Sequence, residues 1–198
     1  MRLRFEEEQK KERRIKLLKE TLLYFVEIAL VILIAWLIVR FAMKPASMIG
    51  STMEPTLYNG EDVIINKTSY AVLTPKRHAV IAFYPEQKEG DETVFDDSSI
   101  LIRRVLGLPG ETVQITGGRI LINGEVYNEG KDFPMITNPG LAATAVTLES
   151  GEYFVLGDNR NNSEDSRYAD IGMVRKRYIV GKIWFTCSPF EKLGFTKG

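Results

Sequence analysis

Two hydroxyl side chains, Ser51 and Thr52, stand directly before Met53 in the stretch GSTMEPTL, residues 50–57. A hydroxyl attacks a carbonyl carbon only when a neighbouring base takes its proton as the new bond forms. The stretch is typical of a nucleophile loop, and its chemistry depends on which side chain the fold places beside it.

Two later segments contain side chains that could complete such a site. In the stretch RRVLGLPG, residues 103–110, two arginines lie in a strand that ends in a turn. The stretch GDNRNNSEDSR, residues 157–167, alternates acidic and basic side chains. Its Asp, Asn and Ser side chains could simply satisfy the backbone groups of a polar loop. The alternation also allows an internal network of ion pairs that would hold a site rigid.

A long apolar segment precedes these stretches. Residues 22–43 have the sequence LLYFVEIALVILIAWLIVRFAM, in which Glu27 is the only charged residue before Arg40. About twenty residues at roughly 1.5 Å each cover a hydrocarbon core of about 30 Å. We therefore expect a single transmembrane helix over residues 21–43. A cleaved signal peptide, the alternative, would have an apolar core of about 7–15 residues followed by small residues at the cleavage point.

The charges beside this segment predict its orientation. Residues 1–20 contain eight Lys or Arg residues and five Glu residues. Because basic residues are enriched on the cytoplasmic side of a span, we expect residues 1–20 in the cytoplasm and residues 44–198 outside the plasma membrane. The whole chain has 26 basic and 26 acidic residues, so its bulk charge does not indicate a nucleic-acid partner.

Residues 44–198 have the pattern of a mostly β domain. Short β-branched or aromatic runs alternate with turn signals that contain Gly, Asn or Pro. Asn123-Gly124 supplies the two positive-φ residues that a type I′ hairpin turn needs. We expect antiparallel sheets, with loops at 85–99 and 128–147 and a small β insertion roughly within residues 110–150. The runs that predict strands are 62–66, 79–84, 100–108, 112–116, 119–124, 152–157 and 178–185.

Taken together, and in this order behind the apolar segment, the three stretches resemble the type I signal peptidase family. The similarity runs from the apolar segment to about Pro189 and includes GEDVIINKTSY (60–70) and IGMVRKRYIVGKI (171–183). The stretch GDNRNNSEDSR is a long and specific match. The resemblance implies a membrane-anchored serine peptidase with a Ser/Lys dyad and a β-rich domain outside the membrane.

The resemblance also implies roles for individual positions. The family's nucleophilic serine precedes the Met of a Met-x-Pro-Thr motif, and that position here is Thr52. The family's general-base lysine precedes the Arg-Val of the strand, and that position here is Arg103. Ser163 matches a serine that orients the lysine. Residues matching those that brace the site are Asp158, Arg160, Asp165 and Arg167, and residues expected in the substrate cleft are Ser51, Met53 and Pro55.

An arginine at the base position changes the chemistry. A lysine can act as the base when burial lowers its pKa from about 10.4 towards neutrality. The pKa of an arginine starts at about 12.5–13.8 and would have to fall by about 6–7, whereas burial achieves about 3–5. We therefore expect Arg103 to donate hydrogen bonds but not to act as the base. Thr52 adds a methyl group that crowds the line of attack.

Three other side chains could replace the missing groups. If the segment is extended, Ser51 points away from the cleft, because adjacent side chains of a strand face opposite sides. Lys67 stands at a position that is often basic in the family for ordinary structural reasons. His78 stands where the family usually has the glycine of Arg-Gly-Asp, and its pKa range would suit a base, although a lone histidine in such a loop is more often a surface residue.

Two functions follow as hypotheses. In the first, the chain is a catalytically impaired pseudoenzyme that binds signal peptides of exported preproteins, or a partner, at the outer face of the membrane. An oxyanion hole built on the backbone N–H of residue 52 does not depend on the side chain there, so binding without cleavage is physically consistent. In the second, the chain is an active signal peptidase I that uses Thr52 or Ser51 with another base.

A third hypothesis is a structural membrane-surface protein that has lost its peptide cleft. In every case we expect the lipid bilayer as a partner and neither a cofactor nor a metal site. The sequence does not determine the oligomeric state.

Overall fold

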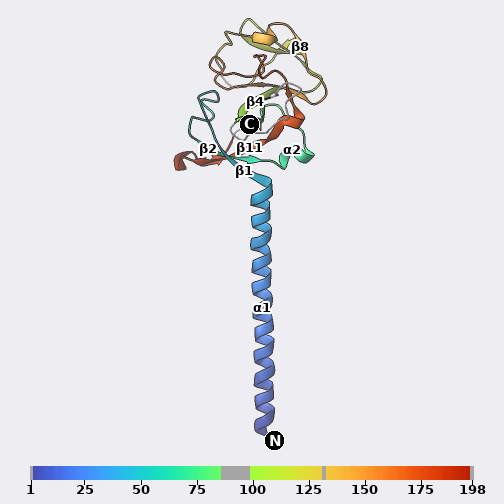
Figure 1. The fold of residues 1–198 in the computed structure, drawn as a ribbon, viewed down its shortest axis with the longest axis vertical. Coiled ribbons are helices and arrows are strands. Elements are labelled where there is room, and N and C mark those ends of the chain that lie inside the picture. The colour runs from blue at the N-terminus through green and yellow to red at the C-terminus, as the bar shows by residue number, and fades with distance from the viewer. Residues whose placement is uncertain (1, 86–98, 131–132, 197–198) are drawn as a thin grey trace. The chain divides into compact units, whose positions relative to one another are not determined.

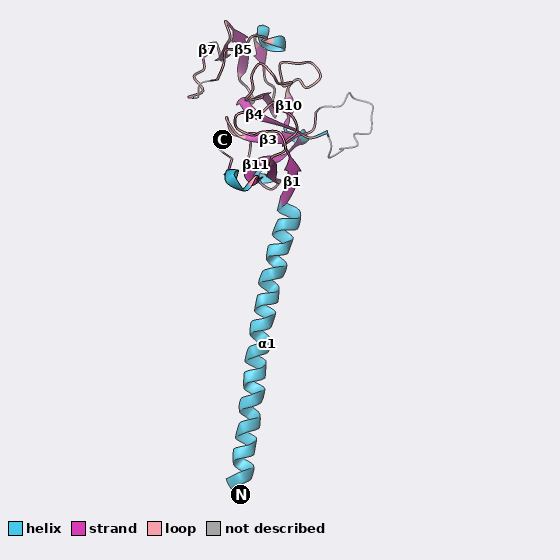
Figure 2. Cartoon of the chain, turned by 90° about the vertical axis from the view of Figure 1, so that its left-hand side faces the viewer, coloured by secondary structure: helices cyan, strands magenta, loops and turns pink. Residues whose placement is uncertain are grey.

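The computed structural model describes residues 2–85, 99–130 and 133–196. It divides into two units, Met1–Ala42 and Met43–Gly198. The first unit is a single helix and the second is built mostly from strands, as Figures 1 and 2 show. The predicted fold class, an N-terminal helix followed by a mostly β antiparallel domain, is confirmed.

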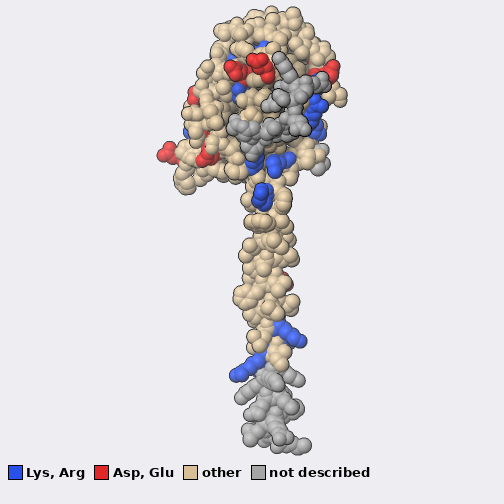
Figure 3. Space-filling view, viewed as in Figure 1, with Lys and Arg blue, Asp and Glu red and all other residues tan. Residues whose placement is uncertain are grey.

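The first unit is helix α1 (Arg2–Ala42). Its segment Arg13–Ala42 is long and apolar enough to cross a membrane, with a mean hydropathy of 2.8, and it is the one such helix in the part of the chain that the structure describes. On the face drawn in Figure 3, the middle of this helix is formed almost entirely by uncharged residues. The helix ends one residue before the predicted boundary, because Met43 begins a strand.

The larger sheet of the second unit contains eight strands, and all of their pairings are antiparallel. The order across the sheet is β1-β2-β11-β3-β4-β9-β10, and β12 pairs with β11. Its strands are β1 (Met43–Ser47), β2 (Asp62–Asn66), β3 (Val80–Phe83), β4 (Leu101–Gly107), β9 (Glu152–Leu156), β10 (Val174–Arg175), β11 (Ile179–Ser188) and β12 (Gly194–Phe195).

The smaller sheet has the order β7-β6-β5-β8 and is formed within residues 112–147. Asn123 and Gly124 have φ values of 54° and 84°, so the predicted hairpin turn is confirmed. The segment 128–147 is not wholly a loop, because it contains a 3-10 helix, η2, and a short strand, β8. The predicted loop at 85–99 lies largely outside the described residues. The strands are β5 (Thr112–Thr116), β6 (Arg119–Ile122), β7 (Glu125–Val126) and β8 (Val146–Thr147), and the remaining short helices are α2 (Ser69–Val72), η2 (Gly140–Ala143), η3 (Lys176–Tyr178) and η4 (Phe190–Lys192).

Strand β4 is central to the larger sheet and is covered on both faces. It pairs with β3, where Arg103 lies opposite Ile81, and with β9, where Arg104 lies opposite Leu156. Because side chains alternate along a strand, these adjacent arginines point to opposite faces, and both are buried. The register also brings the chain that leaves β9 after Leu156 to the position of the two arginines.

Candidate active site

The turn between β1 and β2 carries Thr52. Its backbone is folded back on itself, since the N–H of Leu57 donates to the carbonyl of Met53 at 3.0 Å. Met53 is completely buried and Leu57 is 1% exposed, and both belong to the hydrophobic cluster beneath the turn. These two apolar anchors hold the backbone of Thr52 in place without any contribution from the threonine side chain.

Ser51 does not lie in an extended segment. The segment is a turn, in which the N–H of Glu54 donates to the carbonyl of Ser51 at 3.2 Å, so the premise of an extended segment is wrong. The hydroxyl of Ser51 accepts a hydrogen bond from Nδ2 of Asn162 at 2.9 Å, and its carbonyl accepts one from Nδ2 of Asn159 at 3.1 Å. Ser51 therefore contacts the polar loop 157–167 but has no acidic or basic partner there.

Arg103 lies beside Thr52. Its Nη1 donates to the hydroxyl oxygen of Thr52 at 3.0 Å and to the carbonyl of Ile102 at 2.6 Å. Its Nε donates to the carbonyl of Glu164 at 2.7 Å. The strand, the turn and the polar loop thus meet at the guanidinium group of Arg103, a residue that is only 4% exposed.

The surroundings of Arg103 do not turn it into a base. Burial lowers the pKa of the guanidinium, and the nearby Asp165 and Glu164 oppose that shift. An arginine starts from so high a pKa, about 12.5 or more, that it stays protonated in proteins. At the position that the resemblance assigns to the general base, this chain therefore has a permanent hydrogen-bond donor.

A pocket of about 360 Å³ opens at this point. Its lining contains no lysine and no histidine among the residues that the structure describes. The lining residues are Thr52, Arg103, Asn161, Asn162, Ser163, Glu164 and Tyr168.

Neither alternative base lies at this pocket. Lys67 is exposed on the chain after β2. Nε2 of His78 is hydrogen-bonded to the hydroxyl of Tyr127 at 2.7 Å. The φ of His78 is 67°, in the left-handed region that favours glycine, which agrees with the glycine that the resemblance implies at this position.

The three residues that were expected in the substrate cleft do not lie together in the structure. Met53 is completely buried and offers its side chain to the core. Pro55 lines a separate pocket with Glu61 and Lys192. Of the three residues expected in the substrate cleft, Ser51 is the one whose side chain contacts the polar loop.

Ser163 is held by the acidic and basic residues that follow it. Its hydroxyl donates to Oδ2 of Asp165 at 2.5 Å and accepts from Nη2 of Arg167 at 3.2 Å. Arg167 also forms an ion pair with Asp165 at 2.8 Å, and both side chains are almost fully buried. The contact between this loop and Arg103 comes instead from the carbonyl of the neighbouring residue, Glu164.

Gly157 allows the polar loop to approach Thr52. A Cβ atom at this position would lie 2.4 Å from the Cβ of Ser163 and 2.6 Å from the carbonyl oxygen of Thr52. The N–H of Asn159 donates to the same carbonyl at 3.1 Å. The absence of a side chain at residue 157 is therefore a condition for the site to assemble.

Arg104 and Asp158 pair on the opposite face of β4. Nε and Nη2 of Arg104 each donate to one carboxylate oxygen of Asp158 at 2.7 Å. Neither side chain is exposed. The hydroxyl of Thr56 donates to the same carboxylate, so this ion pair connects the strand, the polar loop and the turn that carries Thr52.

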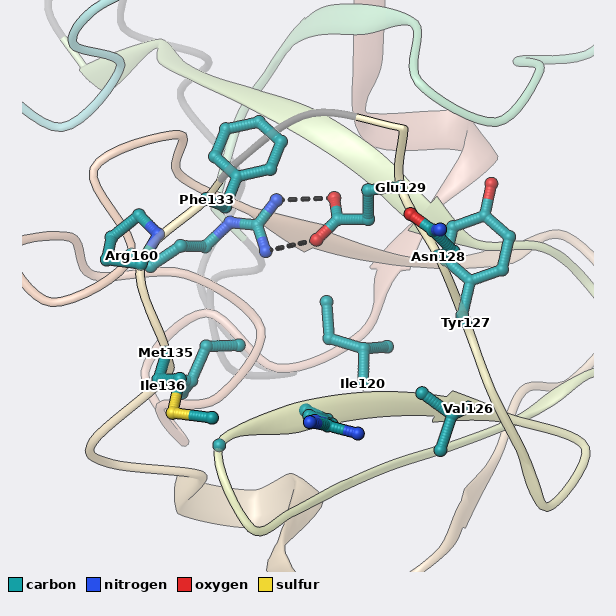
Figure 4. A pocket seen from close by; sticks show the side chains of 12 residues that line it. Ile120, Val126, Tyr127, Asn128, Glu129, Phe133, Met135, Ile136 and Arg160 are labelled. Carbon is teal, nitrogen blue, oxygen red and sulfur yellow. Dashed lines mark hydrogen bonds and ion pairs between the residues drawn. The ribbon is translucent and has the colours of Figure 1, made fainter.

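Arg160 faces the smaller sheet. It forms two hydrogen bonds of 2.5 Å with the carboxylate of Glu129, and its guanidinium lies 3.9 Å from the centre of the Phe133 ring (Figure 4). These residues line a pocket of about 350 Å³ together with apolar side chains such as Ile120 and Met135. Arg160 thus links the polar loop to the segment that follows β7 of the smaller sheet.

Several contacts at the site involve residues to which the sequence analysis gave no role. They include Asn159 and Asn162, which bind Ser51 and Thr52, and Glu164, which binds Arg103. All three stand inside GDNRNNSEDSR, so the motif located them but their partners depended on the fold. No cluster of three or more His, Cys, Asp or Glu residues that could hold a metal ion occurs among the described residues.

Comparisons with known proteins show which family this chain resembles. The family described as signal peptidase, peptidase S26, matches residues 21–187. Signal peptidase I of Leptolyngbya laminosa is 34% identical over 169 residues, which are 84% of this chain and 79% of that protein. Signal peptidase I T of Bacillus subtilis (strain 168) is 34% identical over 180 residues, which are 86% of each protein. A crystal structure of a signal peptidase I from Enterococcus faecalis V583 is 31% identical and covers 57% of this chain and 98% of that chain, with a TM-score of 0.42. The chain belongs to the signal peptidase family, and the resemblance predicted from the three motifs is confirmed.

Proposed function

We propose that this chain is a membrane-anchored member of the signal peptidase family that binds signal peptides of exported preproteins without cutting them. The observation that carries the proposal is the hydrogen bond from Nη1 of Arg103 to the hydroxyl oxygen of Thr52 at 3.0 Å. A general base must accept the proton of the nucleophile. Arg103 donates to that oxygen instead, so the group nearest to the hydroxyl cannot take its proton.

The backbone of the site supports peptide binding. The N–H of Thr52 has no acceptor among the described residues, so it is available to a substrate carbonyl in the way that an oxyanion hole requires. The pocket between Thr52, Arg103 and the polar loop is open. The three ion pairs around it do not use the side chains of Thr52 or Arg103 as partners. Binding and chemistry are therefore separable at this site.

The proposal places the chain at the plasma membrane with one span. Its support is the apolar helix segment Arg13–Ala42 together with the excess of basic residues in residues 1–20. With residues 1–20 in the cytoplasm, the β unit lies on the outer side, where the signal peptides of exported preproteins emerge.

The test compares the original chain with a variant in which both dyad residues are restored. The full chain in detergent is incubated with a preprotein, alongside Thr52→Ser/Arg103→Lys and each single variant. We expect cleavage by the double variant alone, at a rate at least about 100-fold above the original chain, because a positioned base contributes about 10²–10⁴-fold.

The remaining outcomes separate the other hypotheses. If the original chain cleaves at a rate near that of the double variant, it is an active peptidase and the proposal is wrong. If the double variant does not cut and neither protein binds the preprotein, the cleft is absent, and a structural role at the membrane replaces both hypotheses.

A further inference from the structure

The guanidinium of Arg103 has donors that the protein leaves unused. Of its five N–H bonds, the one on Nε and the two on Nη1 are directed to Glu164, Thr52 and Ile102. Nη2 has no acceptor among the described residues. Nη2 is not among the completely buried side-chain atoms that lack a hydrogen-bond partner, so this nitrogen keeps some exposure. Its two N–H bonds are therefore available to the pocket that Arg103 lines.

Two further donors lie beside this nitrogen. The N–H of Thr52 has no acceptor within the described part of the chain. The hydroxyl of Thr52 accepts from Arg103, so its own proton is free to donate in another direction. Three kinds of donor, one of them carrying a full positive charge, meet at the position where the nucleophile of the family stands.

Such a group of donors favours a carboxylate over a peptide bond. A charge-assisted hydrogen bond is roughly twice as strong as one between neutral groups. The acyl carbon of an uncut peptide bears one neutral oxygen. After hydrolysis the same carbon bears two oxygens that share a negative charge, which is the ligand that a guanidinium recognises.

We infer that the pocket between Thr52 and Arg103 binds the C-terminal carboxylate of a peptide, so that the preferred ligand is a signal peptide that has already been released from its preprotein. This inference rests on the proposed function, since it assumes that the cleft binds signal peptides. One carboxylate oxygen accepts from the N–H of Thr52 and the other from Nη2 of Arg103. The substitutions at the dyad thus replace a site for cutting with a site for the product of cutting.

The charge of Glu164 should affect the binding of a carboxylate in this pocket. Glu164 lines the same pocket, its side chain is exposed, and its hydrogen bond to Arg103 comes from the backbone carbonyl, while its carboxylate acts on the arginine through charge alone. Its negative charge opposes an incoming carboxylate. Glu164→Gln should therefore strengthen binding of a carboxylate and leave binding of a neutral ligand unchanged, without disturbing the buried arginine.

The experiment measures the affinity of the full chain, in detergent, for three fluorescent peptides that share one signal sequence ending in a small residue. The first has a free C-terminal carboxylate, the second a C-terminal amide, and the third continues past the cleavage point. Fluorescence anisotropy gives each Kd, and mass spectrometry shows whether the third peptide stays intact. We expect the free acid to bind about tenfold more tightly than the other two, as one added charge-assisted hydrogen bond predicts.

Two variants and one control test whether the preference for the free acid arises at this pocket. Arg103→Gln should abolish the preference for the acid, whereas Glu164→Gln should increase it. Arg119→Gln makes the same change at an exposed arginine of β6 and should leave the preference as it is. Thermal unfolding of each variant identifies any loss of the fold, and the Glu164 variant keeps the test valid if Arg103→Gln does not fold.

The outcomes separate the two proposals. Equal affinity for the three peptides overturns this inference and leaves the proposed function standing. A preference for the acid that Glu164→Gln reduces also overturns it. Failure to bind any of the peptides overturns both proposals.

Discussion

Arg104 and Asp158, which are 54 positions apart in the sequence, form a bidentate ion pair in which neither side chain is exposed. A buried pair of this kind adds little net stability compared with apolar residues, but breaking it leaves an uncompensated charge in the interior. The pair matters most for geometry, because it ties the polar loop to the strand that carries the base position.

Removal of Asp158 should therefore be severe. We expect Asp158→Ala to lower the free energy of unfolding by about 3–5 kcal/mol, measured by denaturant unfolding of the full chain in detergent. The control is Arg175→Gln, whose side chain is 44% exposed in an ion pair of 3.5 Å and which should cost less than about 1 kcal/mol. Similar losses for the two variants would contradict the importance of burial.

The restored dyad should show a characteristic pH dependence. The burial that lowers the pKa of Arg103 also acts on a lysine at that position, and a lysine with a lowered pKa is neutral above that value. In the variant Thr52→Ser/Arg103→Lys, only the neutral amine accepts the proton of the serine hydroxyl introduced at position 52. Its kcat/KM should rise with pH and level off below about 10.4, the ordinary lysine pKa. A profile that falls across this range would exclude lysine as the base.

Gly157 should tolerate no side chain. In Gly157→Ala the new Cβ would lie within 2.6 Å of the backbone oxygen of Thr52, so the polar loop must move away from the turn. Overpacking of this kind costs about 1–3 kcal/mol, and peptide binding measured by anisotropy should weaken with it. The same substitution at Gly194, where the nearest atom would be 4.0 Å away, should leave binding unchanged. Normal binding by Gly157→Ala would show that the loop is not required at this distance.

Tyr70 should destabilise the protein through its hydroxyl. That oxygen is completely buried without a partner among the described residues, and burial raises the pKa of Tyr70 to about 12. An unpaired buried polar group costs about 1–3 kcal/mol, so Tyr70→Phe should raise the free energy of unfolding by roughly 1 kcal/mol. Tyr58→Phe, at a side chain that is 40% exposed, should change it by less than about 0.5 kcal/mol.

The raised pKa of Tyr70 also predicts how the free energy of unfolding changes at alkaline pH. Its pKa is raised in the folded state, so the folded chain keeps a proton that the unfolded chain loses above about pH 10. The stabilisation from that proton is complete below about pH 10 and is lost as the pH rises towards 12. The free energy of unfolding should therefore fall over this range more steeply for the original chain than for Tyr70→Phe. Parallel curves would show that Tyr70 does not contribute.

The sequence was sufficient for features that depend on local pattern. Short β-branched or aromatic runs between turn signals identified seven strands of the domain, and Asn123-Gly124 identified a hairpin because its turn requires two positive φ values. Strands of two residues such as β8, β10 and β12 could not be found, since two residues do not make a recognisable β-branched or aromatic run.

The contacts of the site depended on tertiary structure. The motifs placed Thr52 and Arg103 in the same site, and their hydrogen bond is present. The assumption of an extended backbone at Ser51 failed because burial of Met53 and Leu57 folds the segment into a turn. The partner of Arg160 could not be inferred either, since Glu129 belongs to the insertion and meets the arginine only through the packing of the smaller sheet.

The three ion pairs around the site hold its backbone without using the side chains of Thr52 and Arg103 as partners. Substitution of these two side chains therefore leaves the three ion pairs intact. The proposed loss of cleavage is thus compatible with the retained motifs. Under the proposed function, activity has to be assigned from positions 52 and 103 and not from the motifs alone, and a cell with this chain needs another enzyme to release its exported proteins.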